Sequence, residues 1–102
     1  MSLKIKNDTD GITIIVDTIL IPGEPYFKEF EELSTKIGSF DSSSVIIDLS
    51  QCKYMDTRAI SIILEMNGIL KKKGRKFKLI NVGEEIADLL CSIKLDKIIQ
   101  IC

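Results

Sequence analysis

Two hydrophobic periods alternate along this chain, and their order predicts an α/β fold. Short apolar runs that are rich in β-branched residues are typical of strands and occur at residues 3–6, 12–16, 45–49, 76–82 and 98–101. Apolar residues at the three- and four-residue spacing of a helix occur over 24–37, 57–73 and 84–92. The last strand-like run fits either a strand or a packed tail. The pattern therefore predicts a small layered domain of strands and helices.

The connections between these segments predict how the strands pair. Turn residues at 7–11 join the first two strands and favour an antiparallel hairpin. After it, strands alternate with helices, which predicts largely parallel strands. The run 45–49 is apolar apart from Asp48, which favours a central strand covered on both faces of the sheet. We expect a single domain over residues 1–102, with a mixed sheet of about four to five strands and helices packed on it.

The helix expected at 57–73 is more apolar than one packing surface requires. Between residues 59 and 70 its apolar positions occupy roughly 220° of the helical wheel, where docking on one sheet needs a stripe somewhat over 100° wide. Either neighbouring helices cover the surplus, or an apolar flank stays exposed for a partner. The candidates for such a flank are Ile62, Met66 and Ile69, or Ile60 and Leu64.

Asp56 and Thr57 stand where that helix begins, at the end that favours negative charge. Ordinary helix capping explains such a pair. A second interpretation is that Thr57 is a hydroxyl to be phosphorylated, because a phosphate would carry close to two negative charges and would meet the unpaired amides of the first turn. Arg58 could also pair with it. A partner fitted to an apolar flank would then bind less well, while the domain stays folded.

Charge and missing residue types exclude several classes of function. With 14 Lys and Arg against 15 Asp and Glu, the net charge of -1 argues against direct binding of nucleic acid. No apolar stretch is long enough for membrane insertion. Histidine is absent, as are the HExxH, GxGxxG and phosphate-loop motifs, so the sequence predicts no catalytic residue, no metal site and no cofactor. An enzyme would have to rely on a carboxylate pair such as Asp48 and Asp56.

The cysteines bear on the cellular compartment. Cys52, Cys91 and Cys102 are an odd number without CxxC spacing, and they are expected to be small apolar residues or spectators. Together with the lack of a signal peptide, they predict a reducing, cytoplasmic location.

Two segments resemble the core signature of STAS domains, above all that of bacterial anti-sigma factor antagonists. The first, Val45–Ser50, is an apolar strand that ends in Asp-Leu-Ser. The second, Tyr54–Ala59, matches the family pattern of an aromatic residue, an apolar residue, Asp and a hydroxyl residue ahead of an apolar helix. The resemblance continues through the basic turn 73–76, the strand 77–82 and the ending 95–98.

The resemblance implies a non-enzymatic, phosphorylation-controlled partner switch. In its unphosphorylated state such a domain binds an anti-sigma factor that is also a serine/threonine protein kinase, and so releases a sigma factor for transcription. The kinase phosphorylates the hydroxyl after the Asp of the motif, which here is Thr57, and a phosphatase restores binding. The signature and the helix face together indicate these partner-binding residues: Asp56, Thr57, Arg58, Ala59, Ile60, Ile62, Met66 and, ahead of the first helix, Glu24.

Three residues depart from the family pattern around the acceptor. Thr57 replaces the usual serine, Arg58 replaces a small hydroxyl residue, and Ala59 replaces glycine. A second hypothesis, within the same family, is a constitutive interaction subunit, such as one that clamps the ATPase of a lipid-transport ABC system. In that role Thr57 would be an interface hydroxyl that is never phosphorylated.

Overall fold

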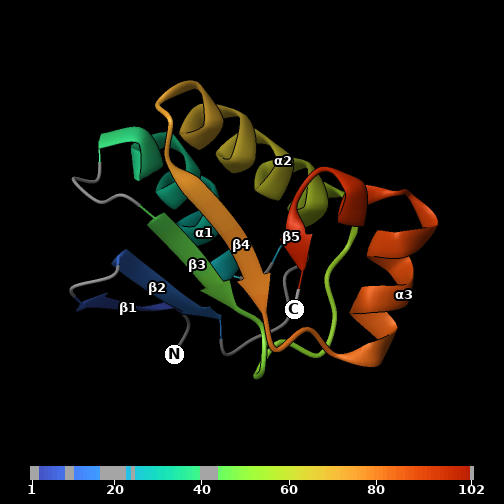
Figure 1. Ribbon diagram of the computed structural model, residues 1–102. Helices are drawn as coiled ribbons and strands as arrows, with labels where there is room; N and C mark the ends of the chain where they lie inside the picture. Colours follow the sequence, from blue (N-terminus) through green and yellow to red (C-terminus); the bar gives the residue numbers. More distant parts are fainter. Residues whose placement is uncertain (1–2, 9–10, 17–22, 24, 40–43, 102) are drawn as a thin grey trace.

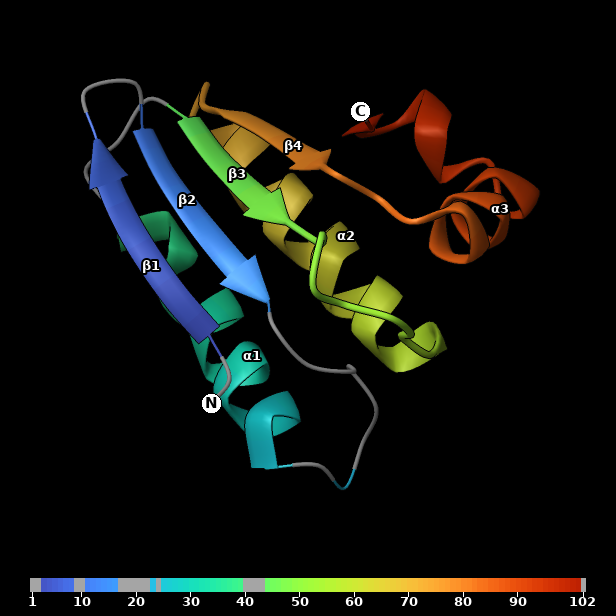
Figure 2. The same cartoon turned by 90° about the horizontal axis from the view of Figure 1, so that it is seen from below.

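The computed structural model describes residues 3–8, 11–16, 23, 25–39 and 44–101. One sheet runs through these segments, with helices α1 and α2 on one face and α3 beside the edge near β5 (Figures 1 and 2). The strands are β1 Leu3–Asp8, β2 Gly11–Val16, β3 Ser44–Asp48, β4 Lys76–Ile80 and β5 Gln100–Ile101. The helices are α1 Pro25–Lys36, α2 Thr57–Lys72 and α3 Glu84–Ser92, with short 3-10 turns at Ile37–Ser39 and Leu95–Lys97.

The strands follow one another across the sheet in chain order. β1 and β2 pair antiparallel, whereas β2, β3, β4 and β5 pair parallel. The predicted hairpin and the predicted parallel strands are both confirmed. The mixed sheet has five strands, within the expected range. The end of the chain contributes the short strand β5, and Ile99 is buried just before it.

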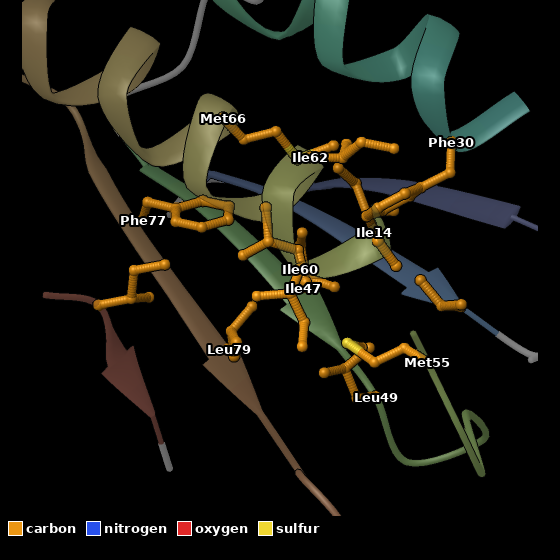
Figure 3. Close-up of a cluster of buried hydrophobic side chains, with 14 of the residues drawn as sticks. Ile14, Phe30, Ile47, Leu49, Met55, Ile60, Ile62, Met66, Phe77 and Leu79 are labelled. Carbon is orange, nitrogen blue, oxygen red and sulfur yellow. The ribbon is translucent and has the colours of Figure 1, made fainter. Parts of the chain in front are cut away.

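Alternate residues of the central strands supply one side of the hydrophobic core (Figure 3). Ile14, Ile47 and Leu79 are fully buried and form one row across β2, β3 and β4. Helix α1 adds Phe30 and Leu33, from the helical face that the sequence predicts. Burying an apolar side chain of this size contributes about 1.5–3 kcal/mol, so this cluster holds the helical layer on the sheet.

Helix α2 is covered on two sides, because it contacts β4 of the sheet and also α1 with the turn that follows α1. Its buried residues are Ala59, Ile60, Ile62, Ile63, Met66 and Leu70, several of which appear in the core of Figure 3. Neighbouring elements therefore cover these six residues, as one of the two interpretations expects, whereas Leu64 stays 37% exposed. An exposed flank at Ile60, Ile62 and Met66 is wrong, since each of these side chains packs inside the fold.

Gly74 ends α2, as the sequence predicts. Its φ is +70°, in the left-handed region that glycine adopts without strain. The amides of Gly74 and Arg75 donate to the carbonyl oxygens of Lys71 and Leu70, at 3.0 and 2.9 Å. This turn closes the helix and directs the chain into β4.

β3 is the central strand of the sheet, as predicted, but the described helices cover one face of the sheet and not both. Buried and half-buried residues alternate along it, with Ile47 buried and its neighbours Ile46 and Asp48 half-buried. Helices α1 and α2 pack on the same face, and among the described residues no helix covers the other face (Figures 1 and 2). Ile46 and Ile47 point to opposite faces, so the apolar sequence of β3 could not show which face is covered.

Candidate functional site

A short connector between β3 and α2 fixes the position of the predicted phosphorylation site. Three of its side chains, Leu49, Cys52 and Met55, are buried in the core. The Cys52 amide donates to the Leu49 carbonyl oxygen at 3.1 Å, and the Cys52 thiol donates to the Tyr54 carbonyl oxygen at 3.4 Å. The connector is therefore anchored where it leads into Asp56 and the start of α2.

Asp56 caps α2. One oxygen of its carboxylate, Oδ1, accepts hydrogen bonds from the amides of Arg58 at 3.0 Å and Ala59 at 3.2 Å. The capping interpretation is thus confirmed for Asp56. The same bonds correct an expectation from the sequence. A phosphate on Thr57 would not find these two amides unpaired, because the Asp56 carboxylate already occupies them.

Thr57 is the first residue of α2 and is exposed to solvent. Its carbonyl oxygen accepts a hydrogen bond from the Ser61 hydroxyl at 3.1 Å. Further exposed residues follow at helical spacing on the same side of α2, and Leu64 among them is 37% exposed. We define the α2 stripe as Thr57, Ser61, Leu64 and Gly68. The predicted phosphoacceptor thus stands at the N-terminal end of an exposed helix surface.

Four of the predicted partner-binding residues do not reach this surface. Ala59 and Met66 are fully buried, and Ile60 and Ile62 are 3% and 6% exposed. Their burial between α2 and the elements packed against it counts against direct contact with a partner, and that contact stays a prediction. Of the other two sequence candidates for an apolar contact, Ile69 is half-buried against the core, whereas Leu64 is exposed.

Arg58 connects α2 to α1. Its Nη2 lies 3.4 Å from Oε2 of Glu31, and both side chains are well exposed to solvent. An exposed ion pair of this kind adds little stability, since water and salt screen it. Its significance is positional, because Arg58 already has an anionic partner right beside Thr57.

A hollow of about 390 Å³ lies between α1 and α2 at this ion pair. Its lining residues come from both helices: Glu31, Ser34, Thr35, Thr57, Arg58, Ser61, Ile62 and Glu65. The sequence identified Thr57, Arg58 and Ile62. It missed Ser61, which helical spacing from Thr57 would have found. Nothing in the sequence pairs Glu31 with α2, because that contact depends on how the two helices pack.

Asp48, at the end of β3, has its carboxylate engaged. Its Oδ1 accepts hydrogen bonds from the Ser50 amide at 2.9 Å and the Asn81 side-chain nitrogen at 3.2 Å. Partial burial raises the pKa of this carboxyl, but the hydrogen bonds from Ser50 and Asn81 and the charge of Lys6 lower it by more, so the pKa lies below its ordinary value. The carboxylates of Asp48 and Asp56 each accept hydrogen bonds from neighbouring amide groups, which gives both residues a structural role.

Two of the residues named from the sequence cannot be placed. Glu24 and Cys102 lie outside the residues that the structure describes, so the partner contact of Glu24 stays a prediction. Cys52 is buried and Cys91 is exposed, and neither forms a disulfide within the described residues. Within the described part of the chain, no group of three His, Cys, Asp or Glu residues could hold a metal ion. No helix over the same residues has the length and apolar character needed to span a membrane.

Comparison of the sequence with known protein families gives a match to the STAS domain over residues 6–102. This chain belongs to the STAS domain family. The match begins within β1, so it includes the N-terminal part that precedes the signature at Val45–Ser50. Comparison of the STAS domain with curated proteins gives no significant match.

Solved structures with this fold include both regulators and a transporter domain. A candidate anti-sigma factor antagonist from Thermotoga maritima has a TM-score of 0.82 at 18% identity, over 97% of this STAS domain and 84% of that chain. The phosphorylated form of the Bacillus cell fate determinant SpoIIAA has a TM-score of 0.75 at 14% identity, over 99% and 91%. The STAS domain of a SulP transporter from Vibrio cholerae has a TM-score of 0.64 at 21% identity, over 83% and 66%. At these identities the likeness shows the fold.

Proposed function

We propose that this STAS domain is an anti-sigma factor antagonist that works as a phosphorylation-controlled partner switch. Its unphosphorylated form binds an anti-sigma factor that is also a serine/threonine protein kinase, and so regulates sigma-dependent transcription. Phosphorylation of Thr57 by that kinase makes the complex dissociate. A phosphatase then removes the phosphate and restores binding. The observation that carries the proposal is the position of Thr57, exposed at the start of α2 and at one end of the α2 stripe.

In this proposal the partner docks on the α2 stripe. Leu64 supplies an exposed apolar side chain in the middle of the helix. At Gly68 no atom lies within 4 Å of the place where a Cβ would stand, so the backbone of another protein can approach closely. Asp56 and Arg58 flank Thr57 at the N-terminal end of the surface. The buried face of α2 contributes by holding this surface rigidly on the sheet.

A phosphate on Thr57 would place close to two negative charges beside the Asp56 carboxylate, at one end of the docking surface. A helix N-terminus favours negative charge, so the folded domain tolerates the added group. The phosphate would also compete with Glu31 for the guanidinium of Arg58, which is next to it in the chain. A bound partner would have to desolvate this charge, which weakens the complex. The switch therefore acts at the surface and leaves the core in place.

The names of structural relatives support this role. SpoIIAA is described as an anti-sigma factor antagonist and has been solved in unphosphorylated and phosphorylated forms. The two forms superpose on this STAS domain with TM-scores of 0.71 and 0.75. A phosphate is thus compatible with this architecture, as a surface switch requires.

Phosphorylation in vitro tests the proposal. The domain is incubated with ATP and a purified anti-sigma factor kinase from the same organism, and mass spectrometry locates the modified residue. We expect one phosphate on the wild type and none on Thr57→Ala. Thr35→Ala is the matched control, because Thr35 is an exposed threonine that lines the same hollow from α1, and it should be modified like the wild type. Phosphate on a different residue would exclude the mechanism.

The alternative function is that of a constitutive interaction subunit, such as one bound to the ATPase of a lipid-transport ABC system. The observation that favours it is the bulk of Arg58, paired with Glu31 at 3.4 Å, where the family pattern has a small hydroxyl residue. In this role the α2 stripe binds permanently and Thr57 stays unmodified. Co-purification with a transport ATPase, through a complex that Thr57→Glu leaves intact, would distinguish it from the partner switch.

A further inference from the structure

The sheet presents a second surface, on the side away from α1 and α2 (Figure 2). Neighbouring residues of a strand point to opposite faces, so the rows that reach this side alternate with the buried rows. One row joins Lys4, Ile15, Asp48 and Ile80, and the next joins Lys6, Thr13, Ile46 and Lys78. We define the open sheet face as Ile15, Ile46, Ile80, Lys4, Lys6 and Lys78.

The centre of the open sheet face carries three isoleucines, with Asp48 between Ile15 and Ile80 in one row and Thr13 beside Ile46 in the next. Ile15, Ile46 and Ile80 lie on three adjacent parallel strands, and each is half-buried. Sheets of parallel strands are ordinarily covered by helices on both faces, because both faces are apolar. In the part of the chain that the structure describes, a helical layer covers one face alone. The three isoleucines are therefore available to a second layer.

The borders of the open sheet face are basic. Lys4 and Lys6 are exposed on β1, and Lys78 is partly exposed on β4, so cations flank the isoleucines on two sides. The carboxylate in the same rows, Asp48, accepts the two hydrogen bonds described above and also interacts with the charge of Lys6, so it offsets one of the three lysine charges. The whole chain has a net charge of -1, so this face is a basic region on a slightly acidic protein. Its charge complements carboxylates on a partner.

We propose that the open sheet face docks an acidic amphipathic helix of a partner protein. The apolar side of that helix would cover the three isoleucines, and its flanking Glu or Asp residues would meet the lysines. A helix fits this face better than a strand does, because β2, β3 and β4 are interior strands whose neighbours on both sides are already paired. The surface lies opposite α2 and does not depend on modification of Thr57. It therefore gives the domain a second partner, independent of the proposed switch.

A pair of designed peptides tests this inference. A helical peptide of about 18 residues, with a leucine stripe flanked by glutamates, is titrated into the ¹⁵N-labelled domain while NMR follows the amide shifts. A matched peptide carries lysine in place of each glutamate. The glutamate peptide should shift the amides of Ile15, Ile46 and Ile80 and should bind about tenfold more tightly than the lysine peptide.

Charge-reversal variants provide a second measurement. Lys6→Glu/Lys78→Glu should weaken binding of the glutamate peptide about tenfold. Lys71→Glu/Lys72→Glu makes the same change in net charge at the exposed C-terminal end of α2, and it should leave the affinity unchanged. The amide spectrum of each variant shows that it is folded before binding is compared.

Several outcomes would overturn the proposal. Equal binding of the two peptides, or an equal loss of affinity in the two variants, would show that the lysines do not select an acidic partner. Shifts confined to α2, or no binding by either peptide, would show that the face is not a docking surface for such a helix. Concentration-dependent shifts of Ile15 and Ile46 in the free domain would assign the face to a second copy of this chain instead.

Discussion

Asp56 and Thr57 are adjacent in the chain, yet their side chains serve different purposes. The Asp56 carboxylate turns back onto the amides of Arg58 and Ala59, whereas Thr57 faces solvent. Both positions could be predicted, because a capping residue just before a helical apolar period locates a helix start. The ion pair between Arg58 and Glu31 could not be predicted, since it joins residues 27 apart through the packing of α1 on α2.

Replacing glycine by alanine should change the free energy of unfolding in opposite directions at Gly68 and at Gly74. An added Cβ meets no atom within 4 Å at either position. Gly68 lies inside α2, where alanine is the better helix former, so Gly68→Ala should raise the free energy of unfolding by about 0.5–1 kcal/mol. Gly74 has a φ of +70°, so Gly74→Ala should lower it by about 1 kcal/mol. Urea denaturation measures both changes, and effects of equal sign would contradict the assigned backbone conformations.

The lowered pKa of Asp48 means that the folded domain should lose stability in acid. Its pKa is lower in the folded domain than in the unfolded chain, so the unfolded chain binds the proton more strongly. The ionised carboxylate therefore stabilises the fold at pH values above its unfolded pKa, and this contribution is lost as the pH falls through the folded pKa. Asp48→Asn should lower the free energy of unfolding by about 1 kcal/mol at neutral pH, through weaker hydrogen bonds to Ser50 and Asn81.

Urea denaturation over the acidic range checks this prediction for Asp48. The difference between the wild type and Asp48→Asn should shrink as the wild-type carboxyl becomes protonated, because both side chains are then neutral. A difference that stays constant from neutral pH to strong acid would show that charge plays no part.

The helices and most strands could be predicted because local signals mark both their period and their ends. Asp56 marks the start of α2 and Gly74 its end, and the structure places both limits there. The covered surfaces could not be predicted, because the apolar pattern does not state which neighbour fills which side. On β3, Ile46 and Ile47 are adjacent residues of the same type, so the sequence does not distinguish them. In the structure Ile47 is buried in the core, whereas Ile46 is half-buried. On α2, Ile60 and Leu64 are both large apolar residues, but Ile60 is buried and Leu64 is exposed.

If the proposed kinase partner docks on the α2 stripe, Leu64 should be part of the contact. Because it is the large apolar residue of the α2 stripe, Leu64→Ala should weaken the complex by about 1–2 kcal/mol, or roughly tenfold in affinity. Ile98→Ala is the matched control, since Ile98 is 56% exposed and follows the turn Leu95–Lys97 after α3, outside the α2 stripe. Isothermal titration calorimetry compares the two variants. Equal effects would place the docking surface elsewhere.

The whole domain places two surfaces on opposite sides of one sheet. Helix α2, which carries the α2 stripe, lies on one side of the sheet, and the open sheet face belongs to the other side (Figures 1 and 2). The hydrophobic core fills the space between them, so a charge added at Thr57 stays remote from the lysines of β1 and β4. Sequence alone identified the α/β class and the family resemblance. The two surfaces became visible only when the packing of α1 and α2 on a single face was known.

Thr57→Glu should separate binding from stability in the whole molecule. Glutamate at the first position of α2 places a negative charge near the helix N-terminus, so the free energy of unfolding should change by less than about 1 kcal/mol. Affinity for the kinase partner should fall about tenfold or more, because the charge must lose water at the interface. Thr57→Val keeps the shape of the side chain without the charge and should retain affinity. If Thr57→Glu unfolds the domain in thermal denaturation, or if Thr57→Val weakens binding as much in calorimetry, then charge at the surface is not the switch.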